Sequence, residues 1–468
     1  MPRELDDIAL SRSPYRTILT LAWPQVLMTL TTFLIGAVDV WAAGRINSSV
    51  QASLGQITQL LMFFMVAGIA AANGAVAAIS QSVGAGLWRR VRRYVGLCLE
   101  LAAAFGALIL VLGLAGKGLL LDALQTPEGI RPITGYFLDV YVLLLPPYYV
   151  VIIINAVFRA QKRVMIPLYC MIIITVCNTV GDLGFGLGWF GFPDLGYRGL
   201  AWSTFGSILA GALFNLAALR RLRMLTCESF ARWRWVRCAL PYVFRVAWPS
   251  GLMSMVWNLG YVALFALVAS LPSGNEVSLA ALTVGNRIEA LLFLPALAFN
   301  LTAGILVGHA LGRGDPAEAK RMGWRIAGIG VGSISLLTVL LWAFVRPVAA
   351  FFAPDPAVSA EAVNYLFYNL LAMPCTVLGM VIVGALNGAG ATLYTFVAMG
   401  GGAWLIRIPL AWGLGLAAGF GPTGIWAAML VSQVLQALYL LWVFALRNWP
   451  RFSLYAKRKE TPHGASAS

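Results

Sequence analysis

Charged side chains are scarce in this chain. Asp, Glu, Lys and Arg make up 11% of its 468 residues, whereas a soluble protein carries about 25%. Apolar residues reach 60%, and the mean hydropathy is +0.82. This balance excludes a soluble globular fold and predicts a polytopic membrane protein.

Groups that bind metals, form disulfides or hold nucleotides are also few. The two histidines, His309 and His463, are too isolated to form a metal site. The six cysteines have no paired spacing, so we expect no disulfide framework. Gly116-Lys117 lacks the upstream glycine and the following Ser or Thr of a phosphate-binding loop. We therefore expect no nucleotide hydrolysis, no enzymatic activity and no organic cofactor.

Long apolar runs, by contrast, recur to the end of the chain. About 20 apolar residues suffice to cross a bilayer as a helix. We therefore predict an all-α protein with twelve transmembrane helices, at residues 18–45, 54–83, 94–117, 133–159, 165–189, 197–219, 241–270, 278–308, 322–345, 361–387, 393–416 and 422–446.

The two halves of the chain repeat each other at an offset of about 225 positions. Trp23-Pro24 recurs as Trp248-Pro249, and Thr126-Pro127 corresponds to Ala353-Pro354. Six spans in each repeat let both halves start on the same side of the membrane, so a pseudo-twofold axis along the membrane normal relates them. We predict a cytoplasmic tail at 1–17, an N-lobe at 18–222, an interfacial linker at 223–240, a C-lobe at 241–446 and a basic tail at 447–468.

The net charge of +15 comes from 33 Lys and Arg against 18 Asp and Glu. If the N-terminus is cytoplasmic, most of these basic residues fall in the inner tails and loops. The outer side then holds only Arg45, Lys117, Arg131, Arg198 and Arg346. This positive-inside distribution predicts an inner-membrane protein with both termini in the cytoplasm. The charge is explained by topology and does not indicate a nucleic-acid partner.

Four oxygen-bearing side chains of the first half fall at similar depth. Asp39 lies in the first span, Asn178 and Asp182 stack four residues apart in the fifth, and Thr204 lies in the sixth. Carboxylate, amide and hydroxyl oxygens suit a hard cation, and two neighbouring carboxylates also suit a proton. The alternative interpretation of Asp39 is structural. In this interpretation Asp39 lies near the outer end of its span and either snorkels to the membrane surface or caps the helix. Two tyrosines have compatible depth and are possible additional members, Tyr136 and Tyr141.

The second half does not repeat this set, since Leu264 stands opposite Asp39. Its intramembrane polar residues are Asn258, Arg287, Glu289 and Arg407. We expect a Glu289–Arg407 ion pair that stabilises the lobe, rather than a second coupling site.

The sequence resembles the multidrug and toxin extrusion (MATE) family across essentially all twelve spans. The similar stretches include GAVDVWAAGRI (36–46), NTVGDLGFG (178–186), GNRIEALLFLPAL (285–297) and RIPLAW (407–412). The resemblance implies two six-helix lobes around a central cleft, and cation-driven export of organic, often cationic, compounds. It also places Asp39, Asn178, Asp182 and Thr204 at the family's cation-site positions.

Two departures from the family pattern are visible. Residues 159–167 read RAQKRVMIP in place of a Gly-rich turn, and Asn258 stands where some members carry an acid. The second departure weakens the case for a cation site in the second lobe.

The leading hypothesis is a monomeric secondary antiporter that uses Na⁺ or H⁺ to export small organic molecules across the bilayer. The alternative is a lipid-linked saccharide flippase of the related fold, which a strongly basic cavity would favour. A receptor or scaffold is disfavoured by the buried acids.

Overall fold

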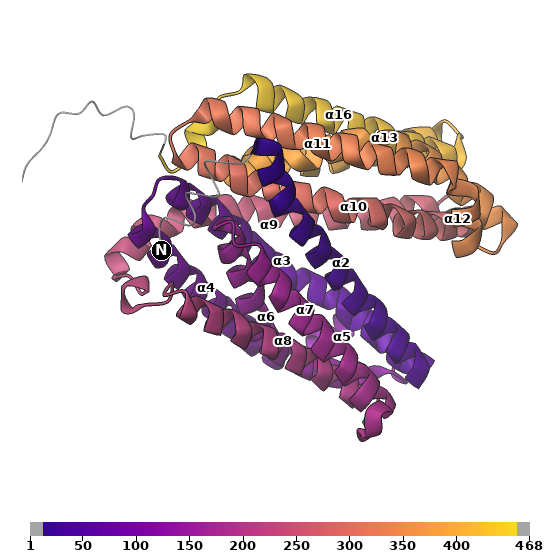
Figure 1. Cartoon of the computed structure of the whole chain (residues 1–468). Coiled ribbons are helices and arrows are strands. Elements are labelled where there is room, and N and C mark those ends of the chain that lie inside the picture. The colour runs from indigo at the N-terminus through magenta and orange to yellow at the C-terminus, as the bar shows by residue number, and fades with distance from the viewer. Residues whose placement is uncertain (1–12, 456–468) are drawn as a thin grey trace, which may run out of the picture. The chain divides into compact units, whose positions relative to one another are not determined.

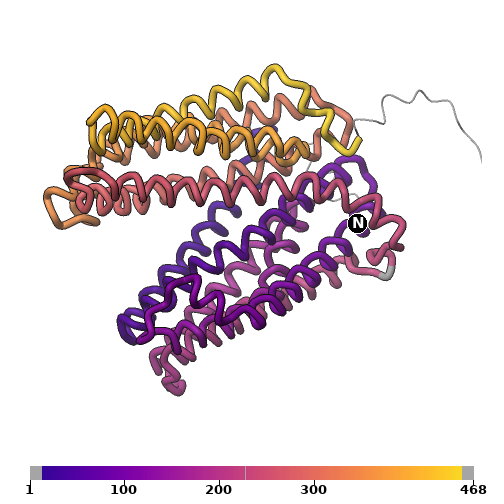
Figure 2. Tube along the Cα trace, turned by 180° about the vertical axis from the view of Figure 1, so that it is seen from behind, coloured from indigo at the N-terminus to yellow at the C-terminus, as the bar shows by residue number. Residues whose placement is uncertain are grey.

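The structure, a computed structural model, describes residues 13–455. Within this range twelve helices are long and apolar enough to cross a membrane. This finding confirms the predicted all-α fold and number of spans. The outer parts of both predicted tails, residues 1–12 and 456–468, lie outside the described residues. Figures 1 and 2 trace the path of the chain through its helices.

The chain divides into two compact units. The N unit comprises Leu27–Ala247, and the C unit joins the residues up to Val26 with those from Trp248 onward. Each division therefore falls within a helix and beside a proline, Pro24 in one case and Pro249 in the other.

The N unit holds six of the membrane-spanning helices and several short segments. They are the greater part of α2 (Pro14–Ile46), α3 (Ser48–Gly84), α4 (Trp88–Ala115), α5 (Lys117–Ala123), α6 (Arg131–Ala160), α7 (Met165–Gly181), the π-helical η1 (Asp182–Gly186), η2 (Trp189–Gly191), α8 (Tyr197–Arg221), η3 (Cys227–Ser229) and the start of α9 (Trp233–Ala269).

The C unit repeats this plan. It contains the rest of α9, α10 (Asn275–Gly312), α11 (Pro316–Ala343), α12 (Val345–Phe352), α13 (Pro356–Ala389), α14 (Thr392–Phe396), the π-helical η4 (Val397–Arg407), α15 (Ile408–Trp412), η5 (Gly413–Ala417), α16 (Gly421–Leu446) and η6 (Trp449–Phe452). The start of α2 also belongs to this unit, and its Gln25 amide donates a hydrogen bond of 2.8 Å to Thr302 Oγ1 on α10.

Local sequence explains where several helices begin. Asn47 precedes α3 and accepts a hydrogen bond from the Val50 N–H at 2.8 Å. Asp315 and Asp355 cap α11 and α13 in the same way, and a proline follows each at the first helical position. Each cap satisfies a backbone donor that the helix itself leaves without a partner.

Glycines let helices within each unit approach closely. A Cβ atom on Gly384 or Gly388 of α13 would collide with the α10 backbone at Asn300 or Gly304. Small residues serve this purpose in membranes, where van der Waals packing rather than the hydrophobic effect joins the helices.

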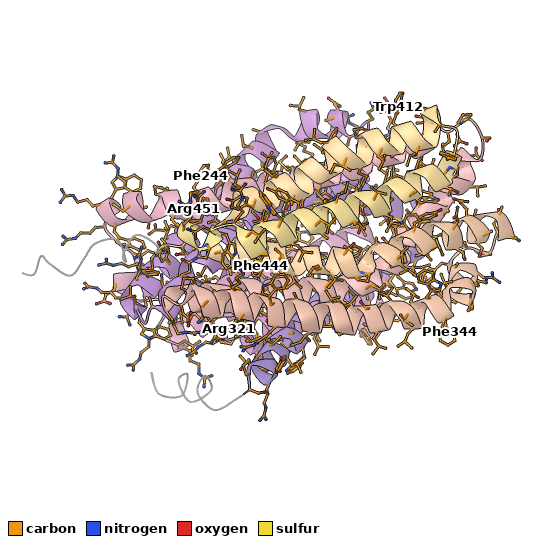
Figure 3. All side chains as sticks on the ribbon, turned by 90° about the horizontal axis from the view of Figure 1, so that it is seen from above. Phe244, Arg321, Phe344, Trp412, Phe444 and Arg451 are labelled. Atoms are coloured by element: carbon orange, nitrogen blue, oxygen red, sulfur yellow. The ribbon has the colours of Figure 1, made fainter. Side chains whose placement is uncertain are left out.

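Side chains labelled in Figure 3 lie at the two ends of the C unit. Arg321 and Arg451 lie toward one end, and Phe344 and Trp412 lie toward the other (Figure 3). Both aromatic side chains are exposed. Exposed aromatic side chains such as these are common near a membrane surface.

Candidate functional site

The four polar residues predicted for the first lobe lie together in the N unit. The Asn178 amide on α7 lies 3.5 Å from Thr204 Oγ1 on α8. The Asp39 carboxylate on α2 lies beside both Asn178 and Asp182, the first residue of η1. Segments far apart in the sequence thus converge on one cluster, as the shared depth of these residues predicts. We call these four residues the acid cluster.

The acid cluster contains more acceptors than donors. Asn178 and Asp182 are completely buried. Both Asp182 carboxylate oxygens, Asp39 Oδ1 and Asn178 Oδ1 receive no hydrogen bond from any residue that the structure describes. Buried polar atoms normally have partners, and an unpaired buried charge is costly. Two adjacent carboxylates with these free oxygens fit a proton or a small hard cation, which would supply the missing positive charge.

Close packing of α7 and η1 against α8 brings these groups together. Gly181 faces Ser203 so closely that a Cβ atom would overlap its side chain, and Gly199 allows the same approach to the backbone of Phe185. The helix changes to π geometry at Asp182. Such π segments are rare and often occur at functional sites.

Ser203 is a member of the site that sequence reasoning missed. Its hydroxyl donates to the Asn178 carbonyl at 2.9 Å, and it lies beside Asp182. In the sequence, the only indication of this role was that Ser203 adjoins Thr204 in a helix rich in small residues. Serine is so common in such helices, however, that its identity alone could not single it out.

The two candidate tyrosines have different surroundings. Tyr141 is buried and lies near Thr204 and both acids, so it belongs to the wall of the acid cluster. The Tyr136 hydroxyl instead accepts a hydrogen bond from Trp202 Nε1 at 3.0 Å, and its ring packs edge-on against Tyr197. Tyr136 therefore forms part of an aromatic group on α6 and α8.

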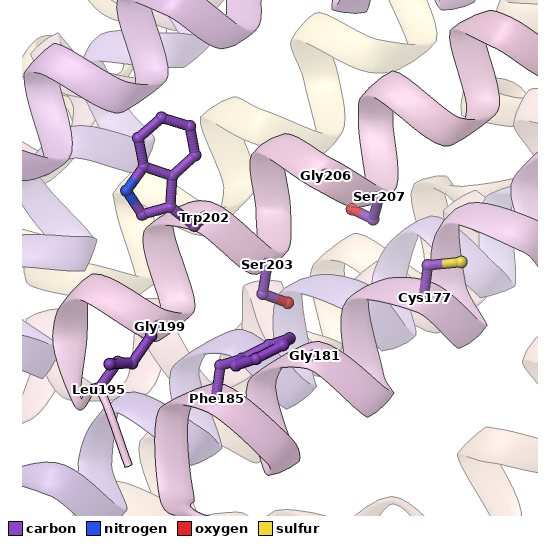
Figure 4. Close-up of a pocket in the computed structure, with 9 residues that line it drawn as sticks. All are labelled: Cys177, Gly181, Phe185, Leu195, Gly199, Trp202, Ser203, Gly206 and Ser207. Carbon is purple, nitrogen blue, oxygen red and sulfur yellow. The ribbon is translucent and has the colours of Figure 1, made fainter. Parts of the chain in front are cut away.

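A groove of about 280 Å³ lies between α8 and the pair α7 and η1 (Figure 4). Its lining is mainly small or apolar and consists of Cys177, Gly181, Phe185, Leu195, Gly199, Trp202, Ser203, Gly206 and Ser207. Gly181 and Ser203 line the groove, and Ser203 also contacts Asn178 of the acid cluster. Because a hydrated ion finds few polar partners on such a lining, the groove suits hydrocarbon better than an ion.

The C unit contradicts the expected Glu289–Arg407 ion pair. The described residues include no salt bridge between these side chains. Arg407 Nε donates to Ser432 Oγ at 3.0 Å, and the guanidinium lies 4.9 Å from the ring centre of Trp257 and 5.8 Å from that of Tyr261. The prediction of a pair was wrong because helix position could not reveal these competing partners.

Glu289 has its own partner on another helix. The Tyr365 hydroxyl lies 3.1 Å from Glu289 Oε2 and 2.9 Å from Asn286 Oδ1. Glu289 Oε1 has no hydrogen-bond partner among the described residues. A single acid near a fixed arginine charge is a poorer cation site than the paired acids of the N unit.

The other two candidates of the second half lie outside this arrangement. Asn258 is exposed, and its amide donates to the Ser254 carbonyl one turn earlier at 2.8 Å. Arg287 is also exposed. The four C-lobe candidates therefore do not form one cluster.

Comparisons with known proteins place these features in a wider context. The sequence model of a family described as MatE matches residues 24–183 and again 249–412. The two matches reproduce the repeat seen in the sequence.

Two curated relatives match nearly the whole chain. "Probable multidrug resistance protein NorM" of Rhizobium meliloti is 25% identical over 445 residues, which cover 92% of this chain and 93% of the relative. "Multidrug resistance protein PmpM" of Pseudomonas aeruginosa is 27% identical over 475 residues, which cover 98% and 96%.

Solved structures agree in fold. The Vibrio cholerae MATE transporter VcmN, in a mutant form, matches with a TM-score of 0.85 at 20% identity, covering 93% of this chain and 98% of that chain. A MATE protein in a bent conformation matches with a TM-score of 0.86 at 18% identity, covering 96% and 98%.

Proposed function

The chain belongs to the MATE family of multi-pass membrane transporters, and from this membership we propose that it exports organic drugs or toxins by cation-coupled antiport. Membership in a transporter family also means that the chain is not an enzyme. The relatives named for multidrug resistance support small organic molecules as the exported class. We place the protein in the inner membrane as a monomer with cytoplasmic termini.

One observation carries the coupling part of this proposal: two adjacent acids in the N unit whose buried oxygens lack donors. In the proposed cycle Asp39 and Asp182 hold the incoming cation, and the Asn178 and Thr204 oxygens complete its shell. Ser203 keeps the Asn178 backbone in place. Binding of Na⁺ or H⁺ would reduce the repulsion between the two carboxylates and so alter the packing of α2, η1 and α8.

The energy available to such a cycle is adequate. One positive charge that moves inward yields about 2.3 kcal/mol per 100 mV of membrane potential. At about 1.4 kcal/mol per tenfold ratio, this corresponds to a roughly 50-fold gradient of an exported neutral molecule. A single coupling cation per cycle is therefore sufficient for the export of a neutral molecule. Exchange of one cation for a monovalent organic cation moves no net charge, so that export is driven by the concentration gradient of the coupling ion.

We do not retain the flippase alternative. A lipid-linked saccharide carries a diphosphate, and the N unit presents acids that would repel it. Basic groups within the spans would attract such a diphosphate. One of them, Arg407, is buried against aromatic rings.

Export of a fluorescent organic cation from proteoliposomes tests the proposal. A sodium gradient and a pH gradient are imposed in separate experiments, each with the membrane potential clamped. We expect one of them to drive export well above the rate without a gradient. Equal rates with and without both gradients would overturn cation coupling, and an absence of any dye movement would overturn the export of organic cations.

A further inference from the structure

Arginines and aromatic residues gather where the first turns of α4 and α9 meet in the N unit. The Arg93 guanidinium lies 5.8 Å from the ring centre of Trp235, and Trp235 packs edge-on against Tyr94 at 5.1 Å. These contacts join the start of one span to the start of another. We call residues 89–93 and 230–237 the basic corner.

The basic corner has an unbalanced charge. It contains seven arginines and no acid, at 89, 90, 92, 93, 232, 234 and 237. The nearby Glu228 pairs with Arg92 at 3.0 Å, and five further arginines have no salt bridge to a described carboxylate, namely Arg89, Arg93, Arg232, Arg234 and Arg237. A strong positive field therefore remains at this surface.

The helix starts add to this field. Neither α4 nor α9 has an acidic residue in its first turn, and Leu87 supplies no side-chain cap to α4. A helix N-terminus carries a partial positive charge and favours anions. The arginines and the two helix starts therefore both favour a bound anion at this surface.

The corresponding helix of the C unit is arranged in the opposite way. At the start of α11, Asp315 caps the helix, and Glu318 pairs with Arg321 at 3.0 Å and with Arg325 at 3.3 Å. The same position in the repeat thus carries two acids among its basic residues in the C unit, Asp315 and Glu318, whereas residues 89–93 contain none. A general need for basic residues at the inner surface would not require this difference.

Exposed aromatic side chains beside the basic corner indicate that it lies at the lipid headgroups. Trp233 is 68% exposed and Phe230 is 53% exposed. Such side chains are favourable at the boundary between headgroups and acyl chains, and basic clusters beside a span attract anionic lipids. We propose that the basic corner binds the headgroup of an anionic phospholipid, with the phosphate against the arginines and the glycerol and upper acyl chain beside Trp233 and Phe230.

Retention of lipid by the purified full-length protein tests the proposal. The protein is incubated with equal amounts of phosphatidylglycerol and phosphatidylcholine, and bound lipid is counted by native mass spectrometry. We expect phosphatidylglycerol to bind preferentially, and 0.5 M NaCl to weaken its binding, since salt screens exposed charges. Equal binding of both lipids, or phosphatidylglycerol binding that is insensitive to salt, would overturn the proposal without any variant.

A triple variant then locates the site. Arg89→Gln, Arg93→Gln and Arg234→Gln together should weaken phosphatidylglycerol binding on the order of 100-fold, at about fivefold for each arginine. The matched control is Arg321→Gln with Arg325→Gln, which should leave it unchanged. An equal loss in the control would place the lipid elsewhere. Displacement of the lipid by millimolar inorganic phosphate would show a site for free anions instead, and would also overturn the proposal.

Discussion

The fifth span of each unit contains a π-helical segment with one buried charged residue, and the two charges are opposite. In the N unit Asp182 begins η1, and its carboxylate oxygens lack donors. In the C unit Arg407 ends η4, with Ser432, Trp257 and Tyr261 around it. A guanidinium has only hydrogen-bond donors and cannot hold a cation, whereas paired carboxylates can bind and release one.

This difference shows how a repeated fold can divide labour. Duplicated helices give both units the same backbone plan. A coupling ion, however, needs only one binding site, whose charged groups are unfavourable when the ion is absent. The proposed function gives this role to the acid cluster, whose buried oxygens lack hydrogen-bond donors among the described residues. Arg407 instead has its partners within the unit, Ser432 and the rings of Trp257 and Tyr261, so the same proposal gives the C unit no coupling ion.

The largest expected effect comes from removing the acids of the N unit. Asp39→Asn and Asp182→Asn should each lower gradient-driven export to the rate measured without a gradient, because one carboxylate with an amide neighbour holds a cation poorly. Export is measured in proteoliposomes at matched protein content. Asp139→Asn is the control, since Asp139 lies in the same unit but pairs with Lys117 at 2.6 Å. Full coupled export by either cluster variant would place the coupling site elsewhere.

Arg407 offers the next largest effect, on stability. Arg407→Leu should lower the free energy of unfolding by about 2–3 kcal/mol, since it loses its contacts with two aromatic rings and its hydrogen bond to Ser432. Thermal unfolding of the purified variant measures this change. Arg287→Gln, at an exposed position on α10, should change stability by less than about 0.5 kcal/mol. A similar loss in both variants would mean that the packing around Arg407 is unimportant.

Close packing beside the acid cluster predicts a smaller effect that a second change relieves. Gly181→Ala places a methyl group against Ser203, which should cost about 1–3 kcal/mol. Ser203→Gly in the same protein should restore part of the loss by making room for that methyl group. The two single variants and the double variant are compared by thermal unfolding. Strict additivity would show that Gly181 and Ser203 do not press on each other.

The smallest effect is expected between Glu289 and Arg407. Because these groups lie near each other but form no ion pair in the described chain, their coupling energy in a double-mutant cycle of Glu289→Gln and Arg407→Gln should stay below about 1 kcal/mol. Ion-driven export should persist in Glu289→Gln. A coupling energy above about 2 kcal/mol would show that Glu289 and Arg407 do form an ion pair. Loss of the response to the ion gradient in a stable Glu289→Gln protein would show that the C unit takes part in coupling.

The sequence was most informative where one side chain or one periodic pattern has few physical explanations. Runs of apolar residues have to become membrane helices, and acids within such runs are costly enough to require a purpose. The spans, the repeat and the convergence of Asp39, Asn178, Asp182 and Thr204 could therefore be predicted. Each of these follows from hydropathy, from spacing or from depth along a helix.

Partner choice within the bundle needed the tertiary structure. Glu289 and Arg407 have opposite charges, so the sequence favoured a pair. Rotation of each helix about its axis decides which side chains meet, and it turns Glu289 toward Tyr365 and Arg407 toward Trp257 and Ser432. Ser203 joins the acid cluster for the same reason, because the Gly181 contact brings α7 and α8 together at that point. The depth of a residue in the membrane follows from its position along the helix, which can be counted in the sequence. The direction in which its side chain faces depends on packing against helices that are far away in the sequence.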